Sequence, residues 1–408
     1  MKDYIQGMAL IIAAGLILAS CASPAQKKLQ EGDVYFGKQD WGRAIVSYSL
    51  AGELDPQIKP VKQIAAAYTG KAGQSFEKGD YESAVFNYEK AVSFDPETRV
   101  PFDIGYARYR VALQYIDSGR YGEALQVLSA AINGGYGDSK AYLARAQVYN
   151  MLGMYSGAIG DATACLDIDS RSAGAYLERG CAFLATSEYK KTVSDLTSAI
   201  GLDASLKDAY YYRGLAFKET GEFNHAINDF KRAVELAPDS TAALVQLGRS
   251  HYLATGYYAA IEQFTRAIEL NRSDVAVAFN DRAVCLGRTG EYNAAVSDLR
   301  VLIKMKPAFP LAYYNLGVVY MKMVQPPPGV DNLDTYLCLD IADKFGCREL
   351  AMGWRWHNIE YNLCCINRAV SGSVLDRCNR ILTENSGSGT IPFENGSLYF
   401  GSENDLYY

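Results

Sequence analysis

The stretch DAYYYRGLAFKETGEFNHAINDFKRAVELAPDS, residues 208–240, decides the fold of this chain because close copies of it stand before and after it. The copies place a glycine at residues 180, 214 and 248, and each glycine follows the previous one by 34 positions. Small residues in the second half of each copy keep the same step. A fixed period of this length is the sequence signature of stacked repeats.

Each copy predicts two antiparallel helices joined by a tight turn. Gly214 on the first helix is expected to face Ala226 on the second, and Ala233 leaves room for the next repeat. Gly221 supplies the residue that ends the first helix, and Pro238 prevents the second helix from continuing. One helix pair cannot bury its apolar face alone, so the pairs must stack on their neighbours.

This pattern resembles the tetratricopeptide repeat family. The resemblance implies an all-α, right-handed superhelical solenoid of antiparallel helix pairs with a concave groove. Full repeats are expected to begin near residues 25, 65, 105, 139, 173, 207, 241 and 276, with a ninth first helix near 310, so the array fills 25–323. The first two steps are 40 residues long, and the prolines in the extra residues, Pro60 and Pro101, predict lengthened connections.

The beginning of the chain carries an apolar run, GMALIIAAGLILA, that is too short to span a membrane and suits a secretory signal. The next residues, Leu18-Ala19-Ser20-Cys21, resemble the lipobox of bacterial lipoproteins. The resemblance implies that residues 1–20 are removed as a signal peptide and that Cys21 carries the lipid. Ala22 then favours the outer membrane, with the protein facing the periplasm. An ordinary signal that contains a cysteine is the alternative.

The repeat pattern ends at QPPPG, residues 325–329, and the composition of 331–408 differs from the rest. That tail holds five of the nine cysteines and two of the three tryptophans. It is interpreted as an irregular C-terminal cap of the solenoid. A frame-shifted or disordered segment is the alternative, and disulfide pairing among its cysteines stays open.

Composition and motifs point away from several function classes. A formal net charge of −6 argues against nucleic acid as a partner. With three histidines, no phosphate loop and no zinc-like cysteine spacing, the sequence offers no catalytic residue, cofactor or metal site. Cys165, Cys181 and Cys285 fall at or beside small-residue positions and are interpreted as packing residues.

Comparison of the repeats with one another predicts structural ion pairs. Four repeats have arginine at their seventh position and aspartate at their twenty-third, and the other four full repeats have neither. The two positions should lie across from each other on the two helices, where the planar guanidinium can meet both carboxylate oxygens. The predicted pairs are Arg145 with Asp161, Arg179 with Asp195, Arg213 with Asp229, and Arg282 with Asp298.

The family resemblance also implies a partner-binding groove, lined by fixed positions of each first helix. In the later repeats these positions hold basic and aromatic residues, whereas Asp33, Glu77 and Asp117 stand in the first ones. The expected groove residues are Tyr211, Lys218, Arg249, Tyr252, Arg288, Tyr314 and Lys322.

A lipid-anchored scaffold that holds a peptide or helix of a partner protein follows, with a role in assembling an envelope, pilus or secretion machine. The alternatives are an enzyme whose catalytic part is the tail, and a cytosolic co-chaperone whose first residues are a misassigned start.

Overall fold

The computed structural model describes residues 22–270, 275–307 and 309–323 of the chain. Cys21, the signal segment 1–20 and the tail 331–408 lie outside the described residues, so the statements made about them above stay predictions. In the described part all elements are helices, α2 to α18, and no strand is present there. The predicted all-α fold of helix pairs is confirmed.

Helices begin at or near every expected repeat start. The first helices of the nine repeats are α2 (Pro24–Gly37), α4 (Val61–Glu77), α6 (Ile104–Asp117), α8 (Ser139–Met151), α10 (Ala173–Ala185), α12 (Lys207–Glu219), α14 (Thr241–Leu253), α16 (Ala276–Thr289) and α18 (Pro310–Lys322). The second helices are α3 (Trp41–Leu54), α5 (Tyr81–Phe94), α7 (Tyr121–Asn133), α9 (Tyr155–Ile168), α11 (Tyr189–Leu202), α13 (Phe223–Leu236), α15 (Tyr257–Leu270) and α17 (Tyr292–Met305).

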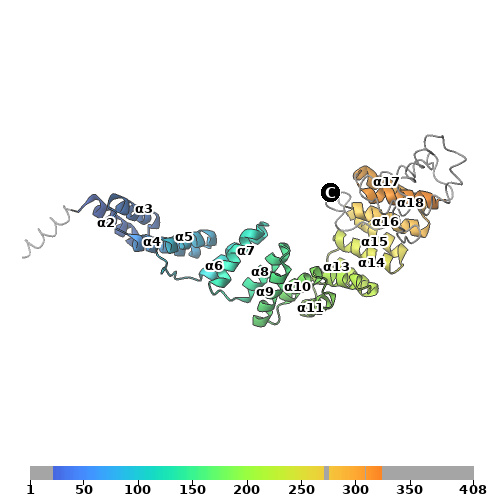
Figure 1. The fold of residues 1–408 in the computed structure, drawn as a ribbon, viewed down its shortest axis with the longest axis horizontal. Helices are drawn as coiled ribbons and strands as arrows, with labels where there is room; N and C mark the ends of the chain where they lie inside the picture. The colour runs from blue at the N-terminus through green and yellow to red at the C-terminus, as the bar shows by residue number, and fades with distance from the viewer. Residues whose placement is uncertain (1–21, 271–274, 308, 324–408) are drawn as a thin grey trace, which may run out of the picture. The chain divides into compact units, whose positions relative to one another are not determined.

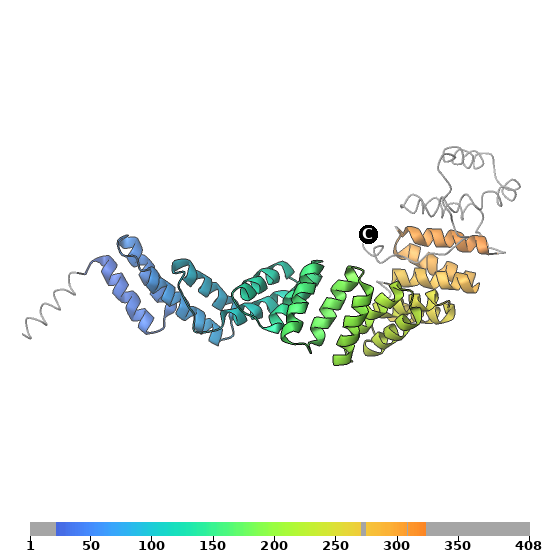
Figure 2. The same ribbon diagram turned by 60° about the horizontal axis from the view of Figure 1, so that its bottom comes forward.

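The chain divides into two compact units, an N-terminal half (Met1–Thr186) and a C-terminal half (Ser187–Tyr408), and each is described by itself. Within each half every helix packs on the helices next to it in the sequence. Figures 1 and 2 show this neighbour-on-neighbour order from α2 to α10 and from α11 to α18. First helices also contact the first helix of the next repeat, as α8 does with α10 and α16 with α18.

The turn inside each repeat uses one left-handed residue at a constant position. Gly221, with φ of 81°, is one of five glycines there, because glycine adopts a positive φ without steric cost. Three repeats place Gln39, Ser187 and Thr255 at the same point, with φ near 60°. The second helix then starts with a cap in repeats such as the second, where the Asp80 carboxylate accepts a hydrogen bond from the backbone N–H of Ser83.

The first two repeats, which are 40 residues long, accommodate their extra residues in different ways. The second gives a lengthened connection, residues 95–103, as the sequence predicted. In the first, the connection is only residues 55–60, and α4 instead begins at Val61, four residues before the expected start. Pro60 explains the difference, because proline is tolerated where a helix begins and its missing N–H costs no helical hydrogen bond there.

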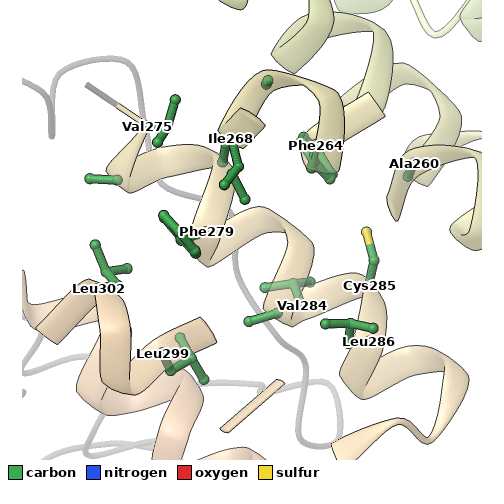
Figure 3. Close-up of a cluster of buried hydrophobic side chains, with 14 of the residues drawn as sticks. Ala260, Phe264, Ile268, Val275, Phe279, Val284, Cys285, Leu286, Leu299 and Leu302 are labelled. Carbon is green, nitrogen blue, oxygen red and sulfur yellow. The ribbon is translucent and has the colours of Figure 1, made fainter. Parts of the chain in front are cut away.

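Glycine is needed at this repeat position for a different reason from the one predicted. A Cβ built on Gly214 would lie 3.0 Å from the ring of Phe230, and one on Gly248 would lie 2.6 Å from the ring of Phe264. The glycine therefore makes room for an aromatic ring of the second helix, and Ala226 is not the residue that demands it. Figure 3 shows the resulting core around α16, with Phe264 from α15 on one side and Leu299 from α17 on the other.

Candidate partner-binding face

Three of the four predicted ion pairs are present as two-pronged bridges. The Arg145 Nε and Nη2 atoms donate to the two carboxylate oxygens of Asp161 over 2.6 and 2.9 Å. Arg213 bonds Asp229 over 2.8 Å on both prongs, and Arg282 bonds Asp298 over 2.7 Å on both. The three aspartates are buried, so each bridge is shielded from water. The fourth pair, Arg179 with Asp195, has one residue in each of the two halves and stays a prediction.

Each of these arginines also reaches the preceding repeat, which the sequence analysis missed. The third guanidinium nitrogen, Nη1, donates to a hydroxyl on the second helix before it, over 3.0 to 3.4 Å. The Arg145, Arg213 and Arg282 guanidinium groups each hold three helices together in this way. A hydroxyl residue two positions after the aspartate position is the signal that could have revealed this contact. The four contacts are Arg145 with Ser129, Arg179 with Thr163, Arg213 with Thr197, and Arg282 with Thr265.

Two residues of the predicted groove are buried and cannot line an open surface. Arg249 is 8% exposed, and its Nε donates to the carboxylate of the fully buried Asp281 over 2.7 Å. Tyr314 is 0% exposed. Arg249 was predicted to line the partner groove, but the sixth position of the next repeat, Asp281, supplies an acid for it within the chain.

The remaining groove residues divide between packing and partial exposure. Tyr211 packs edge-on against the Phe230 ring, and the Lys218 ammonium donates to the Gln246 side chain over 3.1 Å. Tyr252, Arg288 and Lys322 lie together near the ends of α14, α16 and α18. Burial, with the Arg288 charge in second place, lowers the pKa of Lys322, and only Arg288 is exposed.

In the N-terminal half, the corresponding face of α6 carries Arg110, which forms no ion pair with an acidic residue of the described part. Tyr106 occupies the second position of the third repeat, and Arg110 follows one helical turn later on the same face of α6. The Arg110 Nη1 donates to the Tyr106 hydroxyl over 2.8 Å, and this bond is the main cause that lowers the pKa of Tyr106. Among the residues that the structure describes, no carboxylate lies within ion-pair distance of Arg110.

An aromatic cluster fixes this arginine in place. Its guanidinium lies 4.8 Å from the ring centroid of Tyr81, a cation–π contact. Tyr81 meets the Tyr106 ring edge-on, and Phe76 packs against both rings. Phe102, from the lengthened connection, stacks on Phe76 with centroids 4.5 Å apart. The extra residues of the second step thus provide part of the support that orients Arg110.

The acidic residues expected near the beginning of the chain do not extend to this face of α6. Asp33 accepts a hydrogen bond from the Tyr48 hydroxyl over 2.8 Å. Burial, and after it this hydrogen bond, raise the pKa of Tyr48. Glu77 and Asp117 are exposed at the ends of α4 and α6. Lys140 on α8 adds a second positive charge close enough to act on Tyr106. Arg110 was not predicted as a groove residue, because it lies at the sixth position of its repeat and the predicted groove residues come from other positions of the first helices.

Family models decide the identity of the repeats. Models described as tetratricopeptide repeat match residues 65–98 and 208–240, and one described as TPR repeat matches 288–324. This chain is a tetratricopeptide repeat protein. The matches cover the second and sixth repeats and the junction of the eighth with the ninth. Proteins of this family are protein–protein interaction scaffolds. Among curated proteins no relative matches the sequence.

Solved structures of other tetratricopeptide repeat proteins overlap with parts of this chain. YrrB, described as having an unusual peptide-binding site, is 22% identical, and the overlap covers 48% of this chain and 97% of YrrB with a TM-score of 0.41. PilW, described as a type IV pilus biogenesis factor, is 20% identical, with 50% and 95% covered and a TM-score of 0.45. The C-terminal part of a repeat protein from Cytophaga hutchinsonii is 16% identical, with 58% and 95% covered and a TM-score of 0.48.

The other candidate residues occupy structural positions. Cys165 and Cys285 are buried and Cys181 is half-buried, and burial raises the pKa of the Cys285 thiol. His225 is exposed beside Glu222, and His357 lies outside the described residues. In the described part of the chain no cluster of side chains could hold a metal ion. The same part contains no helix with the length and apolar character needed to cross a membrane.

Proposed function

We propose that this tetratricopeptide repeat protein is a lipid-anchored scaffold of the bacterial envelope that holds a partner protein against the face of α6 and α8. The partner segment is an extended or helical peptide that carries an acidic side chain. The proposal assigns no reaction and no cofactor to the chain. It places the scaffold in the assembly of an envelope machine such as a pilus or secretion system.

The proposal rests on the Arg110 guanidinium, which pairs with no carboxylate of the described residues. The Arg145, Arg213, Arg249 and Arg282 guanidinium groups each contact an aspartate of the chain. Among the described residues, the contacts of Arg110 are with aromatic rings and a hydroxyl. A guanidinium that is already oriented loses little entropy on meeting a carboxylate, and this preorganisation favours binding. Lys140 adds attraction for the same charge, whereas Asp103 and Asp138, near Tyr136, weaken it.

The anchor rests on the sequence alone, on the apolar run that ends in Leu-Ala-Ser-Cys. Stable attachment to a membrane takes more than one acyl chain, which a lipoprotein-type modification supplies. Cys21→Ser should leave uncleaved precursor or release the protein from the membrane fraction. An intact Met1 in the purified mature protein, or unchanged membrane retention of the variant, would contradict the anchor.

The partner face is tested by crosslinking in intact cells, followed by identification of the captured protein. Arg110→Gln should remove the main captured protein, because the amide cannot replace the charged fork. Arg288→Gln, which removes an exposed arginine of the C-terminal half, serves as the matched control and should leave capture unchanged. Capture that survives Arg110→Gln but is lost with Arg288→Gln would move the partner to the C-terminal half.

A further inference from the structure

The turn between α8 and α9, in the fourth repeat, is apolar and exposed. It reads Met-Leu-Gly-Met, residues 151–154, and its side chains are 58% exposed at Met151, 40% at Leu152 and 48% at Met154. Single apolar residues on a surface are ordinary, whereas adjacent ones point to a contact surface. Methionine suits such a surface, because its flexible thioether side chain adapts to the shape of a partner.

The other repeats show that the fold does not require apolar residues at this place. Of the eight described turns between a first and a second helix, six others contain a charged residue. The turn of the seventh repeat has one large apolar residue, Leu253, at the position of Met151. The turns on either side of the fourth repeat, residues 117–120 and 185–188, carry no large apolar side chain.

Met154 also occupies a position where an aspartate would stabilise the repeat. It directly precedes α9, and its side chain makes no capping hydrogen bond. At the same position in the first two repeats, the Asp40 and Asp80 carboxylates each accept a hydrogen bond from a backbone N–H of the following helix. A methionine gives up this stabilisation, so the stability of the repeat does not account for its presence.

The apolar turn lies on the same helix as the positive charge of the proposed partner face. Residues spaced three or four positions apart share one side of a helix, and on α8 such a line consists of Lys140, Ala144, Gln147 and Met151. At one end, the Lys140 charge acts on Tyr106, the hydrogen-bond partner of Arg110. Met151 stands at the other end, about 16 Å along the helix. An extended chain covers that distance in about five residues.

We propose that Met151, Leu152 and Met154 form an apolar subsite, which binds a large apolar side chain of the same partner segment whose acid meets Arg110. This assignment rests on the proposed function, because it takes the acidic partner from there. The positive charges of Arg110 and Lys140 hold the acid at one end of α8 and leave the uncharged turn to the apolar group. The partner segment therefore carries an acidic and a large apolar residue, about five positions apart where it is extended.

Random twelve-residue peptides, displayed on phage and selected on the purified full chain, test this pattern. The selected peptides should be enriched in an acidic residue and, about five positions away, in leucine, methionine or phenylalanine. Selection on Met151→Ser combined with Met154→Asp should lose the apolar enrichment and keep the acidic one. Selection on Arg110→Gln should do the reverse. Leu253→Ser, at the equivalent position of the seventh repeat, is the matched control and should change neither.

Met154→Asp alone gives a readout that a purely structural role would not. The new carboxylate should cap α9 as Asp80 caps α5, and hydrogen exchange in α9 should slow by about fivefold. Binding of a selected peptide should nevertheless weaken about tenfold, because the peptide loses an apolar contact. Unchanged peptide binding, in a variant whose slower exchange shows α9 to be folded, would overturn the proposal.

The remaining outcomes separate the apolar subsite from the proposed function. An acidic enrichment that depends on Arg110, without any apolar enrichment, would leave the partner face standing and overturn the subsite. Absence of both enrichments would contradict both proposals. If the turn instead joins two copies of the chain, sedimentation velocity would show a dimer that Met154→Asp dissociates, and this result would also overturn the subsite.

Discussion

The faces of α6 and α16 that carry the sixth repeat position present opposite surfaces. At the sixth position α6 has Arg110, half-buried and held by aromatic rings, with no acid of the described residues near it. At the same position α16 has Asp281, fully buried and paired with Arg249. The comparison teaches that repeat geometry fixes where a side chain lies, while the charges on the neighbouring repeat decide whether it remains available.

The largest difference between the two faces should appear when the buried acid is removed. Asp281→Ala leaves the Arg249 guanidinium buried without its carboxylate, and we expect a loss of about 3–5 kcal/mol of stability. Arg110→Ala removes a half-buried residue that has no acidic partner, and its effect should stay within about 0.5–1 kcal/mol. Hydrogen exchange of the helices measures each effect locally, because stability in repeat proteins is distributed over the repeats.

A companion variant separates loss of the pair from loss of the charge. Arg249→Met combined with Asp281→Leu replaces both ions by apolar groups and should recover most of the stability. A double variant as unstable as Asp281→Ala alone would show that the hydrogen bonds to Asn280, and not the buried charge, dominate this site.

Glycine substitutions give the next largest contrast. Gly248→Ala on α14 would push a methyl group against the Phe264 ring and should cost about 1–3 kcal/mol. Gly73→Ala on α4 meets nothing within 4 Å and should stabilise the helix by up to about 1 kcal/mol. Thermal unfolding compares the two variants, and a destabilising Gly73→Ala would mean that the face of α4 is more crowded than the structure shows.

Weakening one of the regular bridges should have a smaller effect. Arg213→Lys keeps the charge but loses the two-pronged geometry with Asp229 and the hydrogen bond to Thr197, for a cost of about 1–2 kcal/mol. Thr197→Val removes only the bond to the preceding repeat and serves as the partial control. Equal effects of the two substitutions would show that the contact between repeats outweighs the ion pair.

The smallest effect expected is a pH dependence from His251 in the C-terminal half. Burial, and then the charge of Lys231, lower the pKa of His251 below its ordinary 6.5, although Glu262 opposes them. The unfolded chain therefore binds this proton more readily, so stability should decline as pH falls below 6.5 and level off once the folded histidine is protonated. His251→Gln should flatten this part of the pH–stability profile, and an unchanged profile would exclude His251 as its source.

The sequence predicted the repeat starts and the three arginine–aspartate pairs that the structure shows, because both depend on spacing within one helix pair. The same reasoning missed the Ser129 and Thr163 contacts, which cross from one repeat to the next. It also missed Phe230 as the residue that demands a glycine at 214, because two small residues at facing positions suggested a simpler contact. Arg249 was assigned to a partner because the sequence does not show which charge on the next repeat comes within bonding distance.

The sequence by itself determined the fold, since a period of 34 residues with a fixed pattern of small and aromatic side chains allows only stacked helix pairs to bury the apolar surface. The tertiary structure alone decided which charged side chains pair with one another inside the protein. Whether Arg249 meets Asp281, and whether Arg110 meets no acid, depends on how the first helix of one repeat packs against the next. A separation of a few ångströms sets the strength of such a contact, and the spacing of residues along the chain does not specify it.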